Sequence, residues 1–247
     1  MEDINIYLKG RKPKVDWGEP CYEADSLRAY CKNMTWMNDP SFVRAYRRGA
    51  DSGHGWKDIH IEWRVHIILW AASHALRLGG DFVECGVHTG IFSLAACDYL
   101  SFEKQAGRKF WLFDTFQGIP QEQMLEKEKE HRSEYNSRFY FDSYERAKAN
   151  FAPYPNVALV RGMVPDSLST VKIERVCYLS IDMNIAKPEV AAMEYFWDKL
   201  VTGAVVVFDD YGWQNYGEQT RALDAFAASK GVKIATLPTG QGLMIKS

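Results

Sequence analysis

Residues 205–213 read VVVFDDYGW, a run of four apolar side chains that ends in two adjacent carboxylates. Such a short, mostly β-branched run is typical of a strand buried on both faces of a parallel sheet. Asp209 and Asp210 would lie just beyond its carboxyl end, where open α/β sheets bind ligands. Because two like charges side by side repel each other, the pair needs solvent, hydrogen bonds or a cation.

Strands and helices alternate ahead of this run and after it. Strands are expected over 81–86, 109–116, 156–162, 175–184 and 203–211, and helices over 90–100, 143–151, 188–200 and 218–231. The alternation predicts an α/β fold with a Rossmann-like, doubly wound, mostly parallel sheet. Residues 232–238 and 242–247 follow each other without a helix, which predicts a terminal hairpin with one antiparallel strand at or near an edge.

The chain before this alternation is less regular. Residues 1–55 are expected to form an N-terminal extension or lid, with one helix that starts at Pro40 and is capped by Asp39. Residues 56–247 form the main domain, which opens with a helical pattern over 58–78. The very polar stretch 121–138 is expected to be a solvated helix or loop, with a substrate lid as the alternative.

Composition excludes several classes of function. The 247 residues carry 30 Lys and Arg against 32 Asp and Glu, a net charge of −2, without a long run of either sign. This predicts no binding to nucleic acid or to membranes. The N-terminus lacks the apolar core of a signal peptide, and the five cysteines form no CxxC pair. Both observations suit a cytoplasmic protein with reduced thiols. Formation of a homo-oligomer is left open.

Most of the expected strands end in a carboxylate. These residues are Glu84, Asp114, Asp182 and the pair Asp209 and Asp210. The carboxyl ends of parallel strands share one edge of the sheet, so these side chains are expected to meet there. Asp182 and the pair together offer oxygen ligands that suit a hard divalent cation such as Mg²⁺. Adjacent acidic residues also occur by chance, so solvated charges are the alternative.

The loop after the first of these strands reads ECGVHTG over 84–90. Gly86 and Gly90 allow a tight turn and the close approach of a ligand, next to the N-terminus of the following helix. The second glycine of the dinucleotide fingerprint GxGxxG is missing, which favours a cationic or zwitterionic nucleoside over a diphosphate. Asp114 can accept both hydroxyl protons of a ribose. A nucleoside-type cofactor is therefore expected.

The segments FVECGVHTG, FWLFDTFQGIP, YLSIDMN and VVVFDDYGW resemble, in their order and spacing, class I S-adenosylmethionine-dependent methyltransferases. More narrowly, they resemble the macrocin/mycinamicin O-methyltransferase family, over residues 58–247. The resemblance implies a seven-stranded sheet with an antiparallel last strand. It also implies an O-methyltransferase that acts on a hydroxyl of a sugar or polyol, in a surface polysaccharide precursor or a glycosylated natural product. A phenolic or catechol acceptor is the alternative.

The resemblance further implies roles for individual residues. S-Adenosylmethionine would be bound by Glu84, Gly86, Val87, His88, Gly90, Asp114 and Asp182, and Mg²⁺ by Asp182, Asp209 and Asp210. Asp182 would be the general base, and Lys187 is the runner-up for that role. The family usually has a second aspartate where this chain has Asn184, whose amide cannot accept a proton as a base.

Two other classes of function stay open on the sequence alone. An NAD(P)-dependent oxidoreductase or epimerase acting on sugars would explain the YxxxK pattern of Tyr144 and Lys148. That pattern, however, falls before the third expected strand, and the chain lacks the GxGxxG loop. A non-catalytic protein with a methyltransferase fold would explain Asn184. Binding of NADH rather than S-adenosylmethionine would favour the first class. Tight cofactor binding with slow turnover of every acceptor would favour the second.

Overall fold

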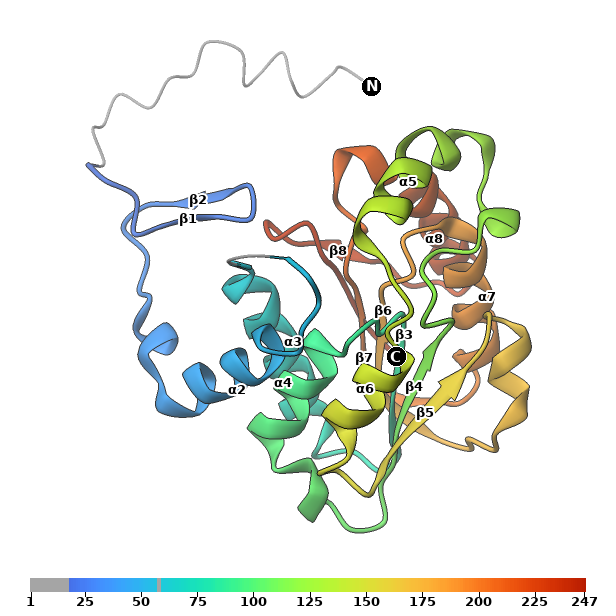
Figure 1. Ribbon diagram of the computed structural model, residues 1–247, viewed down its shortest axis with the longest axis horizontal. Helices are drawn as coiled ribbons and strands as arrows, with labels where there is room; N and C mark the ends of the chain where they lie inside the picture. Colours follow the sequence, from blue (N-terminus) through green and yellow to red (C-terminus); the bar gives the residue numbers. More distant parts are fainter. Residues whose placement is uncertain (1–17, 57–58) are drawn as a thin grey trace.

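A computed structural model describes residues 18–56 and 59–247. Its centre is a seven-stranded sheet with the order β5-β4-β3-β6-β7-β9-β8 (Figure 1). The parallel strands are β3 (Asp81–Cys85), β4 (Phe110–Asp114), β5 (Val157–Arg161), β6 (Val176–Ile181) and β7 (Leu200–Phe208). The closing pair is β8 (Ala235–Thr236) and β9 (Gly242–Ile245), of which β9 runs antiparallel to β7. The predicted fold class and the antiparallel last strand are confirmed, and β8 forms the edge.

Helices cover both faces of this sheet (Figure 1). One face packs against α3 (Glu62–Ala75), α4 (Ile91–Leu100) and α6 (Tyr144–Phe151), and the other against α7 (Ala186–Phe196) and α8 (Gly217–Ser229). Successive residues of a strand point to opposite faces, so Phe82 joins the first apolar core and Val83 the second. Packing of these two cores on the sheet holds the strands in place, and with them the residues at the carboxyl ends of the strands. Short 3-10 turns lie at Thr35–Asn38, Phe102–Lys104, Gln121–Gln123, Asp166–Thr170 and Gln214–Tyr216.

The N-terminal part contains a hairpin and a helix. The hairpin, β1 (Tyr22–Ala24) with β2 (Leu27–Ala29), was not predicted from the sequence. Helix α2 (Pro40–Ala50) begins where predicted, because the Asp39 side chain accepts hydrogen bonds from two backbone N–H groups of its first turn. Helix α2 packs on α4. A lid role for this region stays a prediction. The helix predicted from residue 58 begins later, at the start of α3, and Asp58 lies outside the described residues.

The polar stretch that was expected to be solvated forms α5 (Glu126–Phe139). The expectation is wrong for one side of this helix, because Glu128 and Arg132 are buried. Glu128 accepts a hydrogen bond from the backbone N–H of Ala186 at the start of α7, and Arg132 donates to the carbonyl of Asn184. Charged side chains of α5 therefore bond to the backbone beyond β6, and hydropathy alone does not reveal such contacts.

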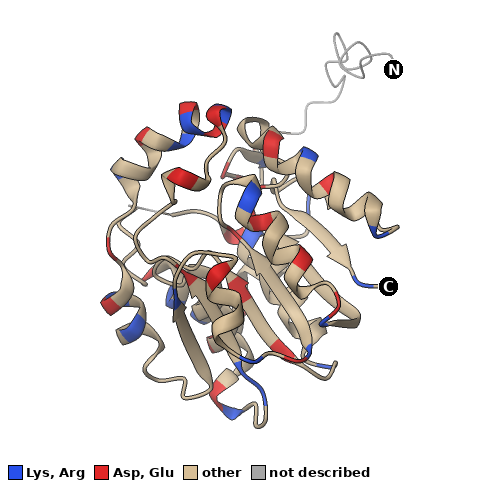
Figure 2. Cartoon of the chain, turned by 90° about the vertical axis from the view of Figure 1, so that its right-hand side faces the viewer, with Lys and Arg blue, Asp and Glu red and all other residues tan. Residues whose placement is uncertain are grey.

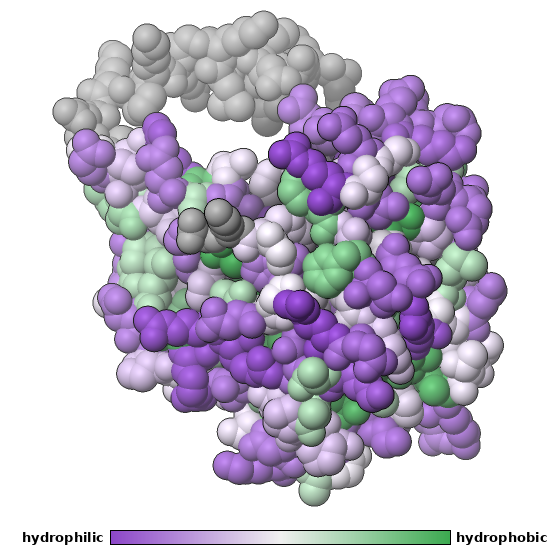
Figure 3. Space-filling model, viewed as in Figure 1, coloured by the Kyte–Doolittle hydropathy of each residue, from purple (hydrophilic) through white to green (hydrophobic). Residues whose placement is uncertain are grey.

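The outer surface carries mixed charges. Basic and acidic residues are interleaved along the outer elements (Figure 2), and the face seen in Figure 3 is mostly hydrophilic. Within the described ranges, no helix is both long and apolar enough to cross a bilayer. The expectations about nucleic acid and oligomeric state stay predictions.

Candidate active site

The acidic strand ends meet at one cavity, as the sequence predicted. A cavity of about 500 Å³ opens beyond the carboxyl ends of β3, β6 and β7, and it is lined by Glu84, Asp114, Asp182, Asp209 and Asp210. A smaller cleft continues from it past the ends of β4 and β5. Together they form an elongated hollow at the edge of the sheet where α/β folds bind ligands.

Three carboxylates converge at one end of this cavity. One oxygen from each of Asp182, Asp209 and Asp210 lies within 4.8 Å of the others. Desolvation, and then the charges of its two neighbours, raise the pKa of Asp182 well above its usual range. Desolvation and then Asp209 raise the pKa of Asp210 to about 7. A divalent cation that prefers oxygen ligands would relieve this repulsion, so the donor set fits Mg²⁺.

A cation that sequence reasoning missed lies beside the carboxylates. Arg64, in the first turn of α3, donates from Nη1 to Asp209 Oδ2 at 2.6 Å. Its Nε and Nη2 donate to the two oxygens of Asp25 at 2.7 and 2.8 Å. Burial lowers the pKa of Arg64, but Asp209 and Asp25 outweigh burial and raise it. An arginine in the first turn opposes the helix dipole, and this is a signal that it has specific acidic partners.

Asn184 is part of the same group of side chains. Its amide donates to Asp182 Oδ1 at 3.2 Å, and its carbonyl accepts from the Tyr216 hydroxyl at 3.0 Å. Its φ of +65° is a left-handed conformation that asparagine tolerates better than most residues. Asn184 therefore orients Asp182. Lys187, in contrast, is exposed on the first turn of α7 and lines neither the cavity nor the cleft.

The glycine loop connects β3 to this group. Gly86 has a φ of +90°, and a Cβ at this position would lie 1.8 Å from the carbonyl oxygen of Asp182. Asp114 Oδ2 accepts hydrogen bonds from the backbone N–H groups of Val87 and His88 at 2.5 and 2.7 Å. Its Oδ1 accepts from the backbone N–H of Phe116 at 2.5 Å and, at 3.4 Å, from the Thr115 hydroxyl. Asp114 therefore fixes the loop, and a ribose hydroxyl would have to take the place of the long Thr115 contact. The loop ends at Gly90, with a φ of +97°, where α4 begins.

Two side chains of this region have buried polar atoms without a hydrogen-bond partner. Glu84 Oε2 and both ring nitrogens of His88 make no hydrogen bond to the described residues. Burial raises the pKa of Glu84 well above its usual range and lowers the pKa of His88 to about 4. Unpaired polar atoms at a cavity wall are places where a ligand can donate or accept. Both residues thus lie where a cofactor could reach them, and their role in binding stays a prediction.

Replacing Gly86 by alanine is expected to lower the free energy of unfolding by at least about 2 kcal/mol and to abolish cofactor binding. The added methyl group would collide with the carbonyl of Asp182. Chemical denaturation and titration calorimetry with S-adenosylhomocysteine measure the two effects. Gly107→Ala is the matched control, because Gly107 has a φ of +76° and no atoms within 4 Å of the new Cβ. If the two variants lose equal amounts of stability and of cofactor binding, the close approach of Gly86 to the Asp182 carbonyl is not the cause.

Glu189 is a second site residue that sequence reasoning missed. Its Oε1 accepts the backbone N–H groups of Met183 and Asn184, both at 3.1 Å, and the Gln219 amide at 2.7 Å. Desolvation raises its pKa to about 8. Glu189 therefore holds the segment that follows β6 and carries Asn184.

Glu189→Gln is expected to flatten the pH dependence of stability. The folded protein keeps a proton on Glu189 between the ordinary pKa of 4.5 and the folded value of about 8. Stability is therefore lost as the pH rises through this window. Glutamine keeps an accepting oxygen but does not titrate. Between about pH 5 and about pH 9, the variant should gain at least about 1 kcal/mol of unfolding free energy relative to the wild type. Denaturation without divalent cations measures this gain, and a pH-independent difference would contradict it.

The sheet order, the antiparallel last strand and the cavity at the strand ends define a Rossmann-like methyltransferase fold. The solved structure of the O-methyltransferase NovP shares this fold, with a TM-score of 0.70 and 20% identity over 87% of this chain and 100% of that chain. The macrocin O-methyltransferase (TylF) family profile matches residues 71–237. The chain belongs to this family, which confirms the resemblance found in the sequence.

Two curated relatives are each 26% identical to this chain over 138 residues, or 53% of this chain and 53% of the relative. They are the 8-demethyl-8-(2,3-dimethoxy-alpha-L-rhamnosyl)-tetracenomycin-C 4'-O-methyltransferase of Streptomyces olivaceus and the demethyldecarbamoylnovobiocin O-methyltransferase of Streptomyces niveus. The chain spans about half the length of the curated relatives it matches.

Proposed function

We propose that the protein is an S-adenosylmethionine-dependent O-methyltransferase that methylates a hydroxyl group of a sugar or polyol and uses Mg²⁺. The observation that carries this proposal is the convergence of Asp182, Asp209 and Asp210 in the cavity that also borders the glycine loop. The relative from Streptomyces olivaceus, named for methylation of a rhamnosyl compound, supports a sugar acceptor. We expect the acceptor to be a glycosylated natural product or a polysaccharide precursor.

The glycine loop and its neighbours would hold the methyl donor. The unpaired oxygen of Glu84 could accept a hydrogen bond from the donor's amino group, and Asp114 Oδ1 could accept from one ribose hydroxyl in place of its long contact with Thr115. Gly86 borders both the cavity and the cleft, and a side chain there would collide with the backbone of Asp182. S-Adenosylmethionine supplies a methyl group that its sulfonium already activates. The task of the protein is then to align the acceptor oxygen and to remove its proton.

Asp182 would take that proton. The acceptor O–H bond breaks, the oxygen bonds to the methyl carbon as the carbon leaves sulfur, and the proton moves to the Asp182 carboxylate. Asn184 engages Oδ1 and leaves Oδ2 for the acceptor. A carboxylate this close to a bound cation stays ionised and can therefore accept the proton. When bound by Asp182, Asp209 and Asp210, Mg²⁺ would supply positive charge beside the acceptor oxygen.

Methyl transfer to a panel of acceptors tests this function. The panel contains nucleotide sugars, glycosides of aromatic compounds and catechol, each incubated with S-adenosylmethionine and Mg²⁺ and analysed by mass spectrometry. We expect methylation of a sugar-containing acceptor. Transfer to catechol alone would instead assign a phenolic acceptor. Calorimetric binding of NADH in place of S-adenosylhomocysteine would overturn the proposal in favour of an oxidoreductase.

A further inference from the structure

Arg64 shares its acidic partners with the proposed cation site. Its Nη1 lies 2.6 Å from Asp209 Oδ2 and 3.9 Å from Asp210 Oδ1, so this nitrogen is close to two of the three carboxylates. The other oxygen of Asp209, Oδ1, accepts from the amide of the buried Gln241 at 3.0 Å. Both oxygens of Asp209 are therefore already engaged by donors of the protein.

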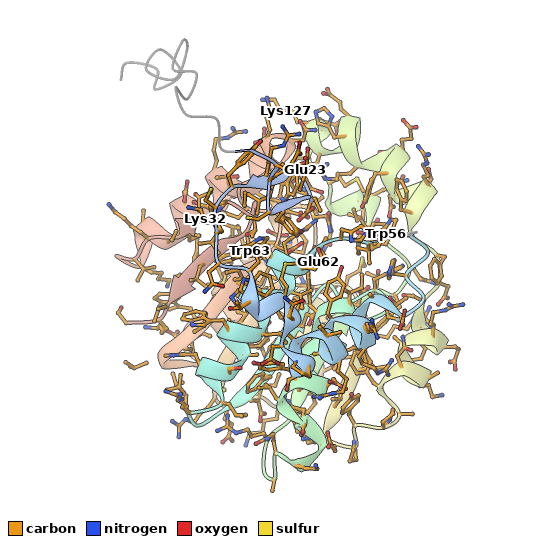
Figure 4. The ribbon with its side chains drawn as sticks, turned by 90° about the vertical axis from the view of Figure 1, so that its left-hand side faces the viewer. Glu23, Lys32, Trp56, Glu62, Trp63 and Lys127 are labelled. Atoms are coloured by element: carbon orange, nitrogen blue, oxygen red, sulfur yellow. The ribbon has the colours of Figure 1, made fainter. Side chains whose placement is uncertain are left out.

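Asp25 holds Arg64 from the opposite side, and the hairpin geometry places it there. Asp25 and Ser26 form the turn between β1 and β2, with φ values of 51° and 58°. Positive φ at both residues is typical of a tight two-residue hairpin turn. The hairpin, which carries Glu23, lies over the start of α3 at Glu62 and Trp63 (Figure 4). The Tyr22 hydroxyl donates to Glu62 Oε2 at 3.0 Å, which anchors the hairpin to this helix.

These charges are largely shielded from solvent. The exposed fraction of the side chain is 17% for Arg64, 12% for Asp25 and 5% for Asp209. Charges with so little solvent around them interact more strongly than surface charges do. A guanidinium does not deprotonate in proteins, so Arg64 keeps its positive charge. An added cation at Asp209 must therefore share that carboxylate with a permanent positive charge.

We propose that Arg64 competes with the divalent cation for Asp209, and that Asp25 limits this competition by holding the guanidinium on the hairpin side. The inference rests on the proposed Mg²⁺ site. Without the cation, Arg64 bridges Asp25 and Asp209. With the cation, Arg64 keeps its two-pronged pair with Asp25. Arg64 and Asp25 are thus positioning residues that set the metal affinity of the site.

The two residues should act in opposite directions. Arg64→Gln removes the competing positive charge, so we expect the affinity for Mn²⁺ to rise by at least about tenfold. Asp25→Asn removes a negative charge and releases Arg64 toward Asp209, so the affinity should fall by at least about tenfold. A purely structural role would make both substitutions lower the affinity.

Mn²⁺ serves as the probe, and the electron paramagnetic resonance signal of free Mn²⁺ reports binding to the 247-residue chain without methyl donor or acceptor. Arg44→Gln is the matched control. It also removes an arginine from an ion pair, with Asp98, but Arg44 lines neither the cavity nor the cleft. Its Mn²⁺ affinity should equal that of the wild type. Circular dichroism confirms that each variant is folded.

Opposite shifts for Arg64→Gln and Asp25→Asn support the inference. Binding of Mn²⁺ by Arg64→Gln but not by the wild type also supports it. Shifts in the same direction, or no shifts, overturn the inference and leave the metal site in place. If none of the proteins binds Mn²⁺, the proposed Mg²⁺ site and this inference are both overturned.

Discussion

Asp182→Asn is expected to lower kcat by about 10²- to 10⁴-fold, the range that a general base contributes. Asparagine has almost the same shape, but it cannot accept the proton of the acceptor hydroxyl. The measurement is the rate of methyl transfer with saturating S-adenosylmethionine and Mg²⁺. Titration with S-adenosylhomocysteine shows whether the variant still binds the cofactor, because Asp182 also lines the cavity next to the glycine loop.

Two further substitutions serve as controls for this experiment. Lys187→Gln should leave the rate unchanged, because Lys187 is exposed and lines neither the cavity nor the cleft. Asn184→Asp removes the amide that donates to Asp182 Oδ1 but keeps Asp182 itself, so it should lower the rate less than Asp182→Asn does. A loss with Lys187→Gln as large as that with Asp182→Asn would move the role of base to the lysine.

Removal of divalent cations should lower turnover by at least about 100-fold, since a metal ion next to the acceptor oxygen contributes several kcal/mol. Excess chelator is the direct test, and added Mg²⁺ should restore the rate. Asp210→Ala should reproduce the loss without a chelator. Asp210 is a better choice than Asp209, because substitution of Asp209 would also remove the hydrogen-bond acceptor of Arg64 and Gln241. Full activity in excess chelator would contradict the use of a metal.

Cofactor binding separates this effect from damage to the fold. S-Adenosylhomocysteine should bind to Asp210→Ala as it does to the wild type, because the residues expected to hold it lie on the glycine loop, at Asp114 and at Asp182. If binding and turnover are lost together, the substitution has disturbed the cavity as a whole.

The sheet and its acidic edge could be predicted because both depend on local patterns. Buried strands such as β7 appear as short apolar runs, and in a parallel sheet the residues that follow them share one edge. Asp182, Asp209 and Asp210 were therefore placed together from the sequence, although they come from two different strand ends.

Contacts between distant segments could not be predicted in this way. Arg64 bonds to residues 39 and 145 positions away, and no periodicity links them. Helix α5 was misjudged for a related reason. Its composition indicates solvation, but Glu128 and Arg132 hydrogen-bond to backbone groups that come much later in the chain, at the start of α7 and just before it. In a single sequence, polar residues that hydrogen-bond to distant segments look the same as polar residues on the surface.

The length of the short hairpin at residues 22–29 sets the position of the Asp25 carboxylate. Its register pairs Tyr22 with Ala29 and Ala24 with Leu27, which leaves only Asp25 and Ser26 for the turn. One inserted residue would shift the register and turn the carboxylate to the other face of the ribbon. Relatives that keep an arginine at the position of Arg64 should therefore keep the length of this hairpin and the aspartate of its turn, and vary more freely at the other positions of the hairpin.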